Sequence, residues 1–475
     1  MSVYPPSRLA WILGALVGIA AGGLLAVLIP LASDDPTPLW LCLPFALLLL
    51  TIAVAPIVAP RFWHSKYPAV AFLLGGSILG FYLFGFGGPT GRGGGAMLHA
   101  AVEYYAFIAL VGGLYVASGG ILVHIRSQAT PLRNTALLAA GAVLANLLGT
   151  TGASVLLIRP FMRMNRGRLR PFHVVMFIFI VSNCGGALTP VGDPPLYLGF
   201  LKGVPFTWPT TTLWPMWLLV NGCLLGMFYI ADTRLPRGRA DDQPDPGSGV
   251  LVVSGLPSML CLLLLVAGVF IDPILAGAGV EALAHIPVGA TFQIVMAVLA
   301  YRLSADDHHD ANQFSLEPVR EVAVLFAGIF LTMVPALEYL RIHAAQLGLH
   351  SPTQFYFLTG GLSAVLDNAP TYVSFLQAAL GASDLPMNAE GIRQLQQLNG
   401  PNLLVGISLG AVFFGALTYI GNGPNFMVRS IVASTHERSG DSGLGTRPPS
   451  FFGYSLYALA ILLPVLVLNW LLFIR

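Results

Sequence analysis

The stretch from Ser182 to Pro195 constrains the fold more than any other part of the sequence. It lies inside an apolar run long enough to cross a bilayer, yet it contains a carboxylate, an amide, hydroxyls, glycines and prolines. Glycine and proline prevent a continuous helix here. Backbone opened in lipid survives only where it is buried in protein or lines a polar cavity, and an acidic side chain at that depth is costly unless it is paired, hydrated or bound to a cation. The stretch therefore predicts half of a binding site between two half-helices.

A second stretch repeats this pattern in the other half of the chain. Residues 187–198 align with residues 416–427. The matched pairs are Leu188 with Leu417, Thr189 with Thr418, Gly192 with Gly421, Asp193 with Asn422, and Pro195 with Pro424. Two interrupted membrane segments in corresponding places of two halves are the best sequence indication of a transporter's binding site.

Composition places most of the surface in lipid. The chain has 475 residues, of which 56% are hydrophobic and 9% charged, whereas soluble proteins carry roughly 25% charged residues. The net charge is only +2 and the basic residues lie at the ends of apolar runs, which argues against binding of nucleic acid. The four cysteines lie in apolar runs without zinc spacing, and structural disulfides are not expected.

Runs of about 20 apolar residues predict an all-α polytopic membrane protein with about eleven spans. The unbroken spans are predicted at 9–30, 39–60, 68–86, 97–125, 208–231, 250–271, 285–303, 319–340 and 451–474. Interrupted spans are predicted at 171–202 and 402–435. Residues 131–163 and 353–381 are too long for one span and too short for two, and each has a polar middle. These two segments predict re-entrant hairpins, with tips at 148–154 and 365–371.

Charge placement fixes the predicted orientation. With the N-terminus in the cytoplasm, the outer loops and the C-terminus hold few basic residues, namely Arg92, Lys202, Arg341, Arg393 and Arg475. This distribution follows the positive-inside rule and gives the two halves opposite orientations. The predicted parts are an N-terminal helix (1–37), a first inverted repeat (38–233), a cytoplasmic linker (234–249) and a second inverted repeat (250–475).

The polar residues at the breaks and tips are the candidate ligands for a small cation or a substrate. Asp193, Asp367 and Asn368 offer the hard oxygen ligands that suit sodium or a proton relay; helix capping and tight turns are the alternative roles. Further candidates are hydroxyl and amide side chains, which small-residue packing could also explain. They are Thr150, Thr151, Ser154, Asn146, Asn183, Thr189, Thr371, Thr418, Asn422 and Asn425.

Other chemistries have little support in the sequence. No P-loop pattern is present, which argues against ATP-driven pumping. No HExxH motif or Cys/His cluster indicates a catalytic metal. No serine or cysteine nucleophile has a plausible base nearby. We therefore expect neither an enzyme nor a resident cofactor.

Three motifs resemble those of one family. Residues 183–195 (NCGGALTPVGDPP) resemble the signature of the ion transporter superfamily, which includes NhaD-type sodium/proton antiporters, arsenite permeases, and citrate and dicarboxylate transporters. Residues 366–371 (LDNAPT) resemble the second hairpin tip of the NhaD type. Residues 149–160 (GTTGASVLLIRP) resemble the first hairpin of a branch of citrate transporters or sodium/proton antiporters. The similarity covers residues 40–475.

The resemblance implies eleven spans, two re-entrant hairpins, a scaffold domain and a moving transport domain of the elevator type, in a homodimer. It implies one cation site at Thr150 and residues 183–193, and another at Asp367, Asn368 and residues 418–425. The hairpin tips read Gly-Thr-Thr and Asp-Asn-Ala, whereas the dicarboxylate branch carries Ser-Asn-Thr at both.

These observations predict a secondary transporter of the cytoplasmic membrane. The leading hypothesis is sodium/proton antiport, with Asp193 and Asp367 binding either sodium or protons. The physical reason is that each predicted pocket brings its own negative charge. The alternative is sodium- or proton-coupled symport of citrate or a similar anion, with the carboxylates holding the coupling cation. The expected partners are the lipid bilayer, a small cation or carboxylate anion, and a second copy of the chain.

Overall fold

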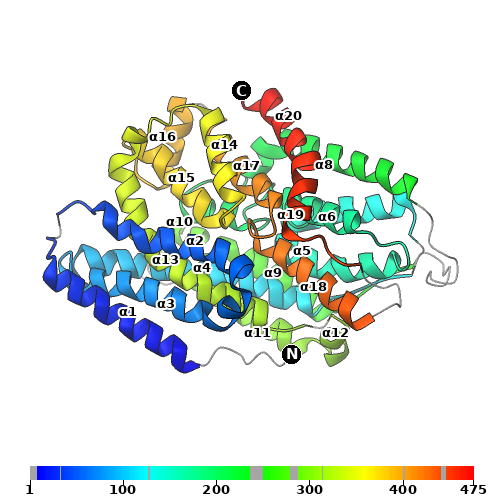
Figure 1. Cartoon of the computed structure of the whole chain (residues 1–475), viewed down its shortest axis with the longest axis horizontal. Helices are drawn as coiled ribbons and strands as arrows, with labels where there is room; N and C mark the ends of the chain where they lie inside the picture. Colours follow the sequence, from blue (N-terminus) through cyan, green and yellow to red (C-terminus); the bar gives the residue numbers. More distant parts are fainter. Residues whose placement is uncertain are drawn as a thin grey trace. The chain divides into compact units, whose positions relative to one another are not determined.

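The computed structural model of the chain is almost entirely helical (Figure 1). It describes residues 8–32, 34–126, 129–235, 250–278, 287–312, 314–399, 402–439 and 446–475. Most of the predicted cytoplasmic linker, residues 236–249, lies outside this part of the chain. Two compact units are present. Unit 1 comprises Met1–Ile108, Glu317–His350 and Val373–Leu398, and unit 2 comprises Ala109–Leu316, Ser351–Tyr372 and Asn399–Arg475.

Unit 1 is built from long apolar helices. Its main elements are α1 (Arg8–Leu28), α2 (Leu43–Val58), α3 (Pro60–Phe84), the first part of α4 (Arg92–Gly119), α13 (Glu317–His343), the last part of α15 (Asn368–Ala382) and α16 (Ala389–Asn399). Short 3₁₀ turns lie at Leu39–Cys42, Gly88–Thr90 and Ala344–Leu347.

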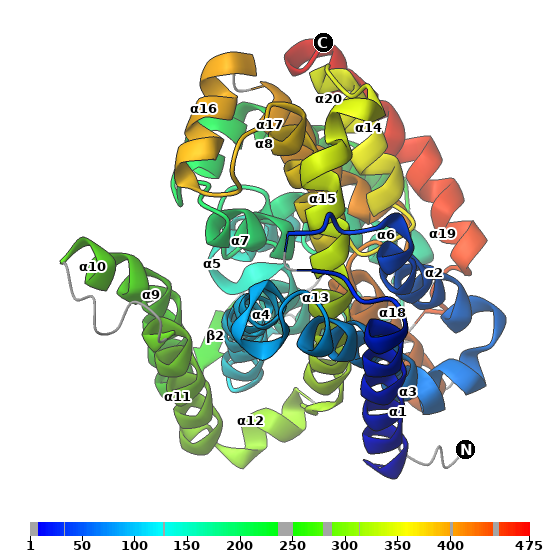
Figure 2. The same ribbon diagram turned by 90° about the vertical axis from the view of Figure 1, so that its left-hand side faces the viewer.

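Helices α1 and α3 of unit 1 lie side by side in both ribbon views (Figures 1 and 2). Gly14, Gly18 and Gly22 follow one another at a spacing of four, so they share one face of α1. A Cβ atom at Gly22 would lie 1.9 Å from the Ser77 carbonyl oxygen of α3. Small residues allow this backbone contact, which is how helices associate in lipid without a hydrophobic driving force.

Unit 2 holds the rest of the helices and a short ribbon of two strands. Its elements are the last part of α4, β1 (Leu122–Arg126), α5 (Pro131–Met164), α6 (Pro171–Ile180), α7 (Pro194–Leu201), α8 (Trp208–Arg234), β2 (Val250–Ser254), α9 (Leu256–Ala267), α10 (Ile271–Gly277), α11 (Val288–Leu303), α12 (Asp306–Ala311), α14 (Pro352–Ser363), the start of α15, α17 (Asn402–Phe414), α18 (Gly423–Ser439), α19 (Phe451–Tyr457) and α20 (Leu463–Phe473). Helices α9 and α11 lie side by side in this unit (Figure 2).

Helix α5 folds back on itself at Gly149. This residue has φ 72° and ψ 155°, which is not helical. A straight helix of 34 residues would separate its ends by about 51 Å. Instead, the amide of Asn134 at the first end donates to Asn165 Oδ1, just past the other end, at 2.8 Å. The two arms therefore run antiparallel, with residues 148–154 at the tip.

Both stretches that align with one another begin in an interruption of α-helix in the structure. Helix α6 ends at Ile180 and α7 begins at Pro194, with only a 3₁₀ turn at Cys184–Gly186 between them. Helix α17 ends at Phe414 and α18 begins at Gly423, with a 3₁₀ turn at Gly415–Leu417. At each break, backbone N–H and C=O groups leave the α-helical hydrogen-bond pattern, and polar side chains lie between the ends of two helices.

Some predicted boundaries were wrong. The last residues of the helix predicted at 97–125 form strand β1, and the first residues of the helix predicted at 250–271 form strand β2. The two strands pair antiparallel, with Leu122 opposite Ser254. The glycine pair Gly119–Gly120 ends α4, and the β-branched residues of both segments favour strands. Helix α3 begins at Pro60 rather than at residue 68, with Pro68 inside it. The short helices α12 and α16 lie between the predicted segments.

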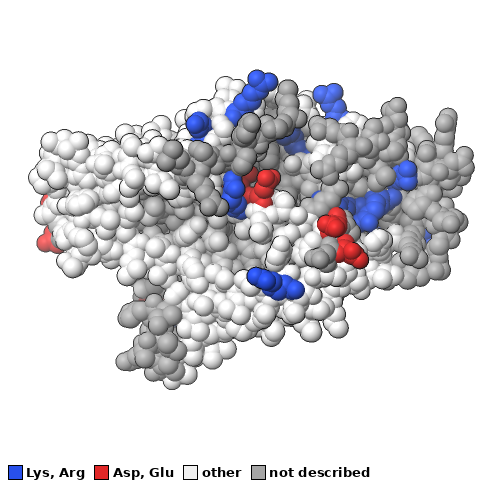
Figure 3. All heavy atoms as spheres, turned by 90° about the horizontal axis from the view of Figure 1, so that it is seen from below, with Lys and Arg blue, Asp and Glu red and all other residues white. Residues whose placement is uncertain are grey.

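The chain is a polytopic membrane protein. Among the described residues, nine helices are long and apolar enough to cross a bilayer. They span Ala10–Leu28, Leu39–Val58, Pro60–Phe84, Arg92–Gly119, Pro131–Met164, Trp208–Arg234, Leu256–Leu275, Glu317–Leu347 and Phe451–Phe473. Figure 3 shows one face of the molecule, on which uncharged side chains predominate and charged ones gather mainly in the middle and right of the view.

Candidate functional site

The Asp193 carboxylate is the centre of the candidate site in unit 2. Its side chain is 1% exposed. The Thr150 hydroxyl donates to Oδ1 at 2.8 Å, and the Asn422 amide donates to the same oxygen at 3.0 Å. The Asn368 amide donates to Oδ2 at 2.8 Å. The donors come from the tip of α5, the second break and the start of α15, so four segments far apart in sequence meet at one carboxylate.

The structure separates the roles of the two candidate aspartates. Asp193 occupies the N-cap position of α7, but its side chain makes no capping bond to that helix. Asp367 accepts the backbone N–H of Ala369 on Oδ1 at 3.0 Å and so closes the first turn of α15. Its carbonyl oxygen accepts the Thr371 hydroxyl at 2.9 Å. Asp367 and Thr371 therefore support the start of α15, whereas Asp193 faces the side chains of other segments.

Asparagines connect the two breaks beside Asp193. The Asn422 amide also donates to Asn183 Oδ1 at 3.1 Å. The Asn183 amide donates to Asn425 Oδ1. The Asn425 amide in turn donates to the carbonyl oxygens of Gly415 and Thr418, both at 2.9 Å. All three asparagines are at most 1% exposed, so nearly every polar atom here is satisfied within the protein, as burial requires.

Two threonines attach the breaks to the hairpins with matching bonds. The Thr189 hydroxyl donates to the Asn146 carbonyl at 2.6 Å and accepts the N–H of Gly192 at 3.0 Å. The Thr418 hydroxyl donates to the Ala364 carbonyl at 2.6 Å and accepts the N–H of Gly421 at 3.1 Å. Neither threonine contacts Asp193. They hold the loops that present Asp193 and Asn422.

Glycine allows both loops to fold tightly. A Cβ atom at Gly192 would lie 2.1 Å from the Gly186 carbonyl oxygen, and one at Gly421 would lie 2.6 Å from the Gly415 carbonyl oxygen. The aligned glycines therefore make the same close backbone contact in each break.

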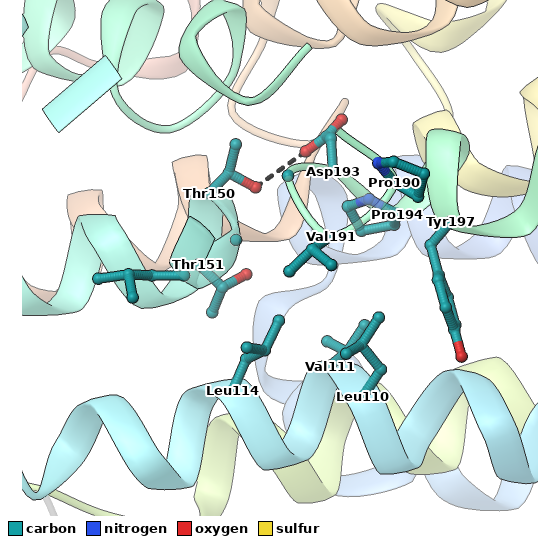
Figure 4. A pocket seen from close by; sticks show the side chains of 13 residues that line it. Leu110, Val111, Leu114, Thr150, Thr151, Pro190, Val191, Asp193, Pro194 and Tyr197 are labelled. Atoms are coloured by element: carbon teal, nitrogen blue, oxygen red, sulfur yellow. Dashed lines mark hydrogen bonds between the residues drawn. The ribbon is translucent and has the colours of Figure 1, made fainter. Parts of the chain in front are cut away.

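A small cavity lies next to the carboxylate (Figure 4). The centre of a water-sized sphere can occupy about 20 Å³ within it, which is room for roughly one water or a small ion. Thr150, Thr151, Asp193 and Tyr197 line it with apolar residues of α4. The Thr150 hydroxyl points toward Asp193, whereas Thr151 points away from it (Figure 4).

The donor set around Asp193 fits a small hard cation or a proton. Asn368 Oδ1 is buried and has no hydrogen-bond partner, although its amide nitrogen donates to Asp193. Carboxylate, amide and hydroxyl oxygens are the ligands that hard cations prefer. Asp193 and Asn368 could therefore hold sodium as the transported or coupling ion.

Helix ends add a field that favours negative charge. Helix α7 begins at Pro194, directly after Asp193. Helix α15 begins at Asn368, which donates to Asp193. Helix α18 begins at Gly423, directly after Asn422, which also donates to Asp193. Helix N-termini stabilise anionic groups. These helix starts therefore place partial positive charge near Asp193.

The structure gathers residues that the sequence assigned to two separate sites. Thr150, Asn368 and Asn422 share the Asp193 carboxylate, with Asn183 and Asn425 behind them. Sequence reasoning did not select Ser182 or Tyr197. Ser182 Oγ lies 2.7 Å from Ser154 Oγ in the first hairpin, and its place directly before Asn183 was the only signal. Nothing in the sequence marked Tyr197 as a cavity residue.

A comparison with protein families matches residues 34–474 to a family described as "Putative citrate transport". The chain belongs to this family. The match covers both breaks and both hairpin tips, and membership agrees with the expectation of a transporter rather than an enzyme. A comparison with curated proteins finds no significant match.

Proposed function

We propose that this member of the citrate-transport family is a sodium/proton antiporter in which Asp193 alternately holds a proton and a sodium ion. The observation that carries the proposal is the single buried carboxylate on which both hairpins and both breaks converge. A group shared by so many segments responds to any movement of one of them. Its occupancy and the conformation of the protein are therefore coupled.

Burial gives Asp193 a reason to bind a cation. Its hydrogen-bond donors Thr150, Asn368 and Asn422 are neutral, and in the described part of the chain no Lys, Arg or His forms an ion pair with it. An ionised carboxylate removed from water is costly when it lacks a compensating charge. A proton or a sodium ion supplies that charge. Since the two compete for the same oxygens, entry of one releases the other.

The matching bonds of Thr189 and Thr418 support two inverted repeats around this site. Inverted repeats place a binding site near the middle of the membrane and allow alternating access. The hydrogen-bonded site residues all belong to unit 2. We infer that unit 2 is the moving transport domain of an elevator-type carrier and unit 1 the scaffold, in a homodimer in the cytoplasmic membrane with the N-terminus inside.

Citrate symport is the second candidate, because the family description and the helix N-termini at the site favour it. In this mechanism a proton or sodium ion neutralises Asp193. The amides of Asn368 and Asn422 and the starts of α7, α15 and α18 then become available to a substrate carboxylate. The Asp367–Asn368 tip of the second hairpin would contribute the backbone N–H groups at the start of α15.

One experiment separates the two candidates. The purified full-length protein is reconstituted in vesicles that contain a pH-sensitive dye, and sodium, lithium or citrate is added outside under a proton gradient. Proton movement evoked by sodium without citrate supports antiport. Uptake of labelled citrate that needs sodium or protons supports symport and contradicts the antiport assignment. Absence of both fluxes in protein that remains folded would contradict both.

A further inference from the structure

The open end of the first hairpin holds a buried polar cluster that the proposed transport chemistry does not use. It consists of Asn134, Asn165, Arg168, His173 and Asp232, called here the base cluster. None of these side chains is more than 4% exposed. They come from both ends of α5, the turn after it, α6 and α8. The cluster therefore connects the base of the hairpin to two neighbouring helices.

Asp232 is the acceptor at the centre of the base cluster. Its Oδ2 accepts the Asn134 amide at 2.8 Å. Its Oδ1 accepts Arg168 Nη2 at 2.7 Å and lies 2.9 Å from His173 Nε2. Asn134 and Asn165 also exchange amide hydrogen bonds at 2.8 and 2.9 Å. The two arms of the hairpin are thus joined to one another and to the same carboxylate.

The charges of the base cluster balance. His173 Nδ1 accepts the backbone N–H of Arg170 at 3.0 Å, so the ring hydrogen lies on Nε2, where it donates to Asp232. The imidazole is neutral, and the charges of Arg168 and Asp232 cancel. Removing one partner of a buried ion pair leaves an uncompensated charge, which strongly opposes opening of the cluster.

The hairpin is attached to the first break along its whole length. Above the base cluster, Ser154 Oγ lies 2.7 Å from Ser182 Oγ, and the Asn146 amide donates to the Gly185 carbonyl at 2.7 Å. At the tip, the N–H of Thr150 donates to the Gly192 carbonyl at 2.8 Å. Opening the hairpin would require all of these bonds to break together.

The second hairpin lacks the residues for such a base. The alignment that pairs residues 148–150 with 366–368 places Pro352 opposite Asn134 and Ser383 opposite Asn165. Proline has no side-chain donor or acceptor, so the reciprocal amide pair cannot form there. The base cluster is a feature of the first half alone.

We propose that the base cluster is a clamp that keeps the first hairpin closed on α6 and α8 throughout the transport cycle. Thr150 then stays against Asp193 in every state, and the first hairpin does not open as a gate. Asp232 acts as a positioning residue for Thr150. The clamp depends on the proposed function in one respect: the proposed function assigns Thr150 and Asp193 a part in transport.

A distance measurement tests the clamp without a transport assay. Leu147→Cys and Leu218→Cys replace exposed side chains near the tip of α5 and on α8, in a background with the four native cysteines changed to alanine. Spin labels at both sites are followed in vesicles with sodium, without sodium, and at acidic and alkaline pH. The clamp predicts one distance under all conditions. A second, longer distance under any condition would overturn it, and a failure of the proposed function would not alter this reading.

A double-mutant experiment tests the positioning role. Asp232→Asn should raise the half-saturating cation concentration roughly tenfold, because one misplaced hydrogen bond to a charged group has about that effect. In a Thr150→Ala background the same change should have no further effect on half-saturation. An equal effect in both backgrounds, or a loss of folded protein without a change in half-saturation, would show a purely structural role.

Discussion

At the scale of single residues, two aspartates with the same sequence signal have different surroundings. Both lie at interruptions in membrane segments, and both precede a helix start. Asp193 leaves its own helix uncapped and contacts Thr150, Asn368 and Asn422 instead. Asp367 bonds the backbone of its own helix. Only the first arrangement links several parts of the protein through one charge.

We expect Asp193→Asn to lower the transport rate about 100-fold or more, because losing an interaction with a charged group costs roughly 3 kcal/mol. Asp367→Asn should retain most of the rate, since asparagine also caps helices well. The measurement is flux in vesicles, normalised to folded protein by gel filtration. An equal loss of transport rate in both variants would indicate that Asp367 also takes part in cation exchange. Wild-type rates in both variants would show that neither carboxylate takes part in the mechanism.

At the scale of elements, the tip of α5 depends on one backbone conformation. Gly149 lies in a region of φ and ψ that is essentially restricted to glycine. A Cβ atom there would also lie 3.3 Å from the Val191 carbonyl oxygen of the first break. The turn places Thr150 beside Asp193, so the backbone at Gly149 and the chemistry at the carboxylate are connected directly.

Gly149→Ala is therefore expected to destabilise the protein by about 1–3 kcal/mol and to weaken transport. The matched control is Gly226→Ala on α8, where an added Cβ meets nothing within 4 Å and a helical alanine stabilises by about 0.5–1 kcal/mol. Thermal unfolding in detergent compares the two variants. A lower melting temperature for Gly226→Ala than for Gly149→Ala would contradict this view of the tip.

The paired threonines give a second prediction for elements. Thr189→Val and Thr418→Val each remove a donor to a hairpin carbonyl and an acceptor for a loop N–H. Each should cost about 1–3 kcal/mol, the range for leaving buried polar groups unsatisfied. Serine at either position should restore most of the loss. If valine and serine behave alike, the hydroxyl bonds do not hold the breaks in place.

At the scale of the whole molecule, the sparse charge requires a lipid surrounding, and the positions of the basic residues predict the orientation. In the proposed topology, eleven crossings place the N-terminus inside and the C-terminus outside, with the two hairpins entering from opposite sides. The nine long apolar helices among the described residues include α5, which is a hairpin. The predicted total of eleven spans is reached only if the shorter helix α11 and the two broken segments also cross the membrane.

A reporter that fluoresces only in the cytoplasm should therefore be dark when fused after Arg475 and bright when fused before Met1. Alkaline phosphatase, which is active only outside, should show the reverse. A fusion within residues 236–249 is the control and should behave like the N-terminal one. Fluorescence of both fusions would mean an even number of crossings and would contradict the prediction that the two halves have opposite orientations.

The sequence by itself determined the membrane class, the places of the two breaks and of the fold-back in α5, and most of the residues around Asp193. These features depend on local physics, because apolar runs must lie in lipid and glycine, proline and carboxylates interrupt them. Helix ends were less well determined: strands replaced the ends predicted at 120–125 and 250–255, since pairing between distant segments decides them.

Only the tertiary structure decided that residues from both predicted sites meet at the Asp193 carboxylate. Hydrogen bonds between residues hundreds of positions apart, such as Asn422 to Asp193, depend on how the breaks meet, and no local pattern encodes that. The same holds for the base cluster, where Asn134, His173 and Asp232 each read as ordinary helix-end residues. A buried polar group acquires its role from its partners, and partners are assigned only when the chain is folded.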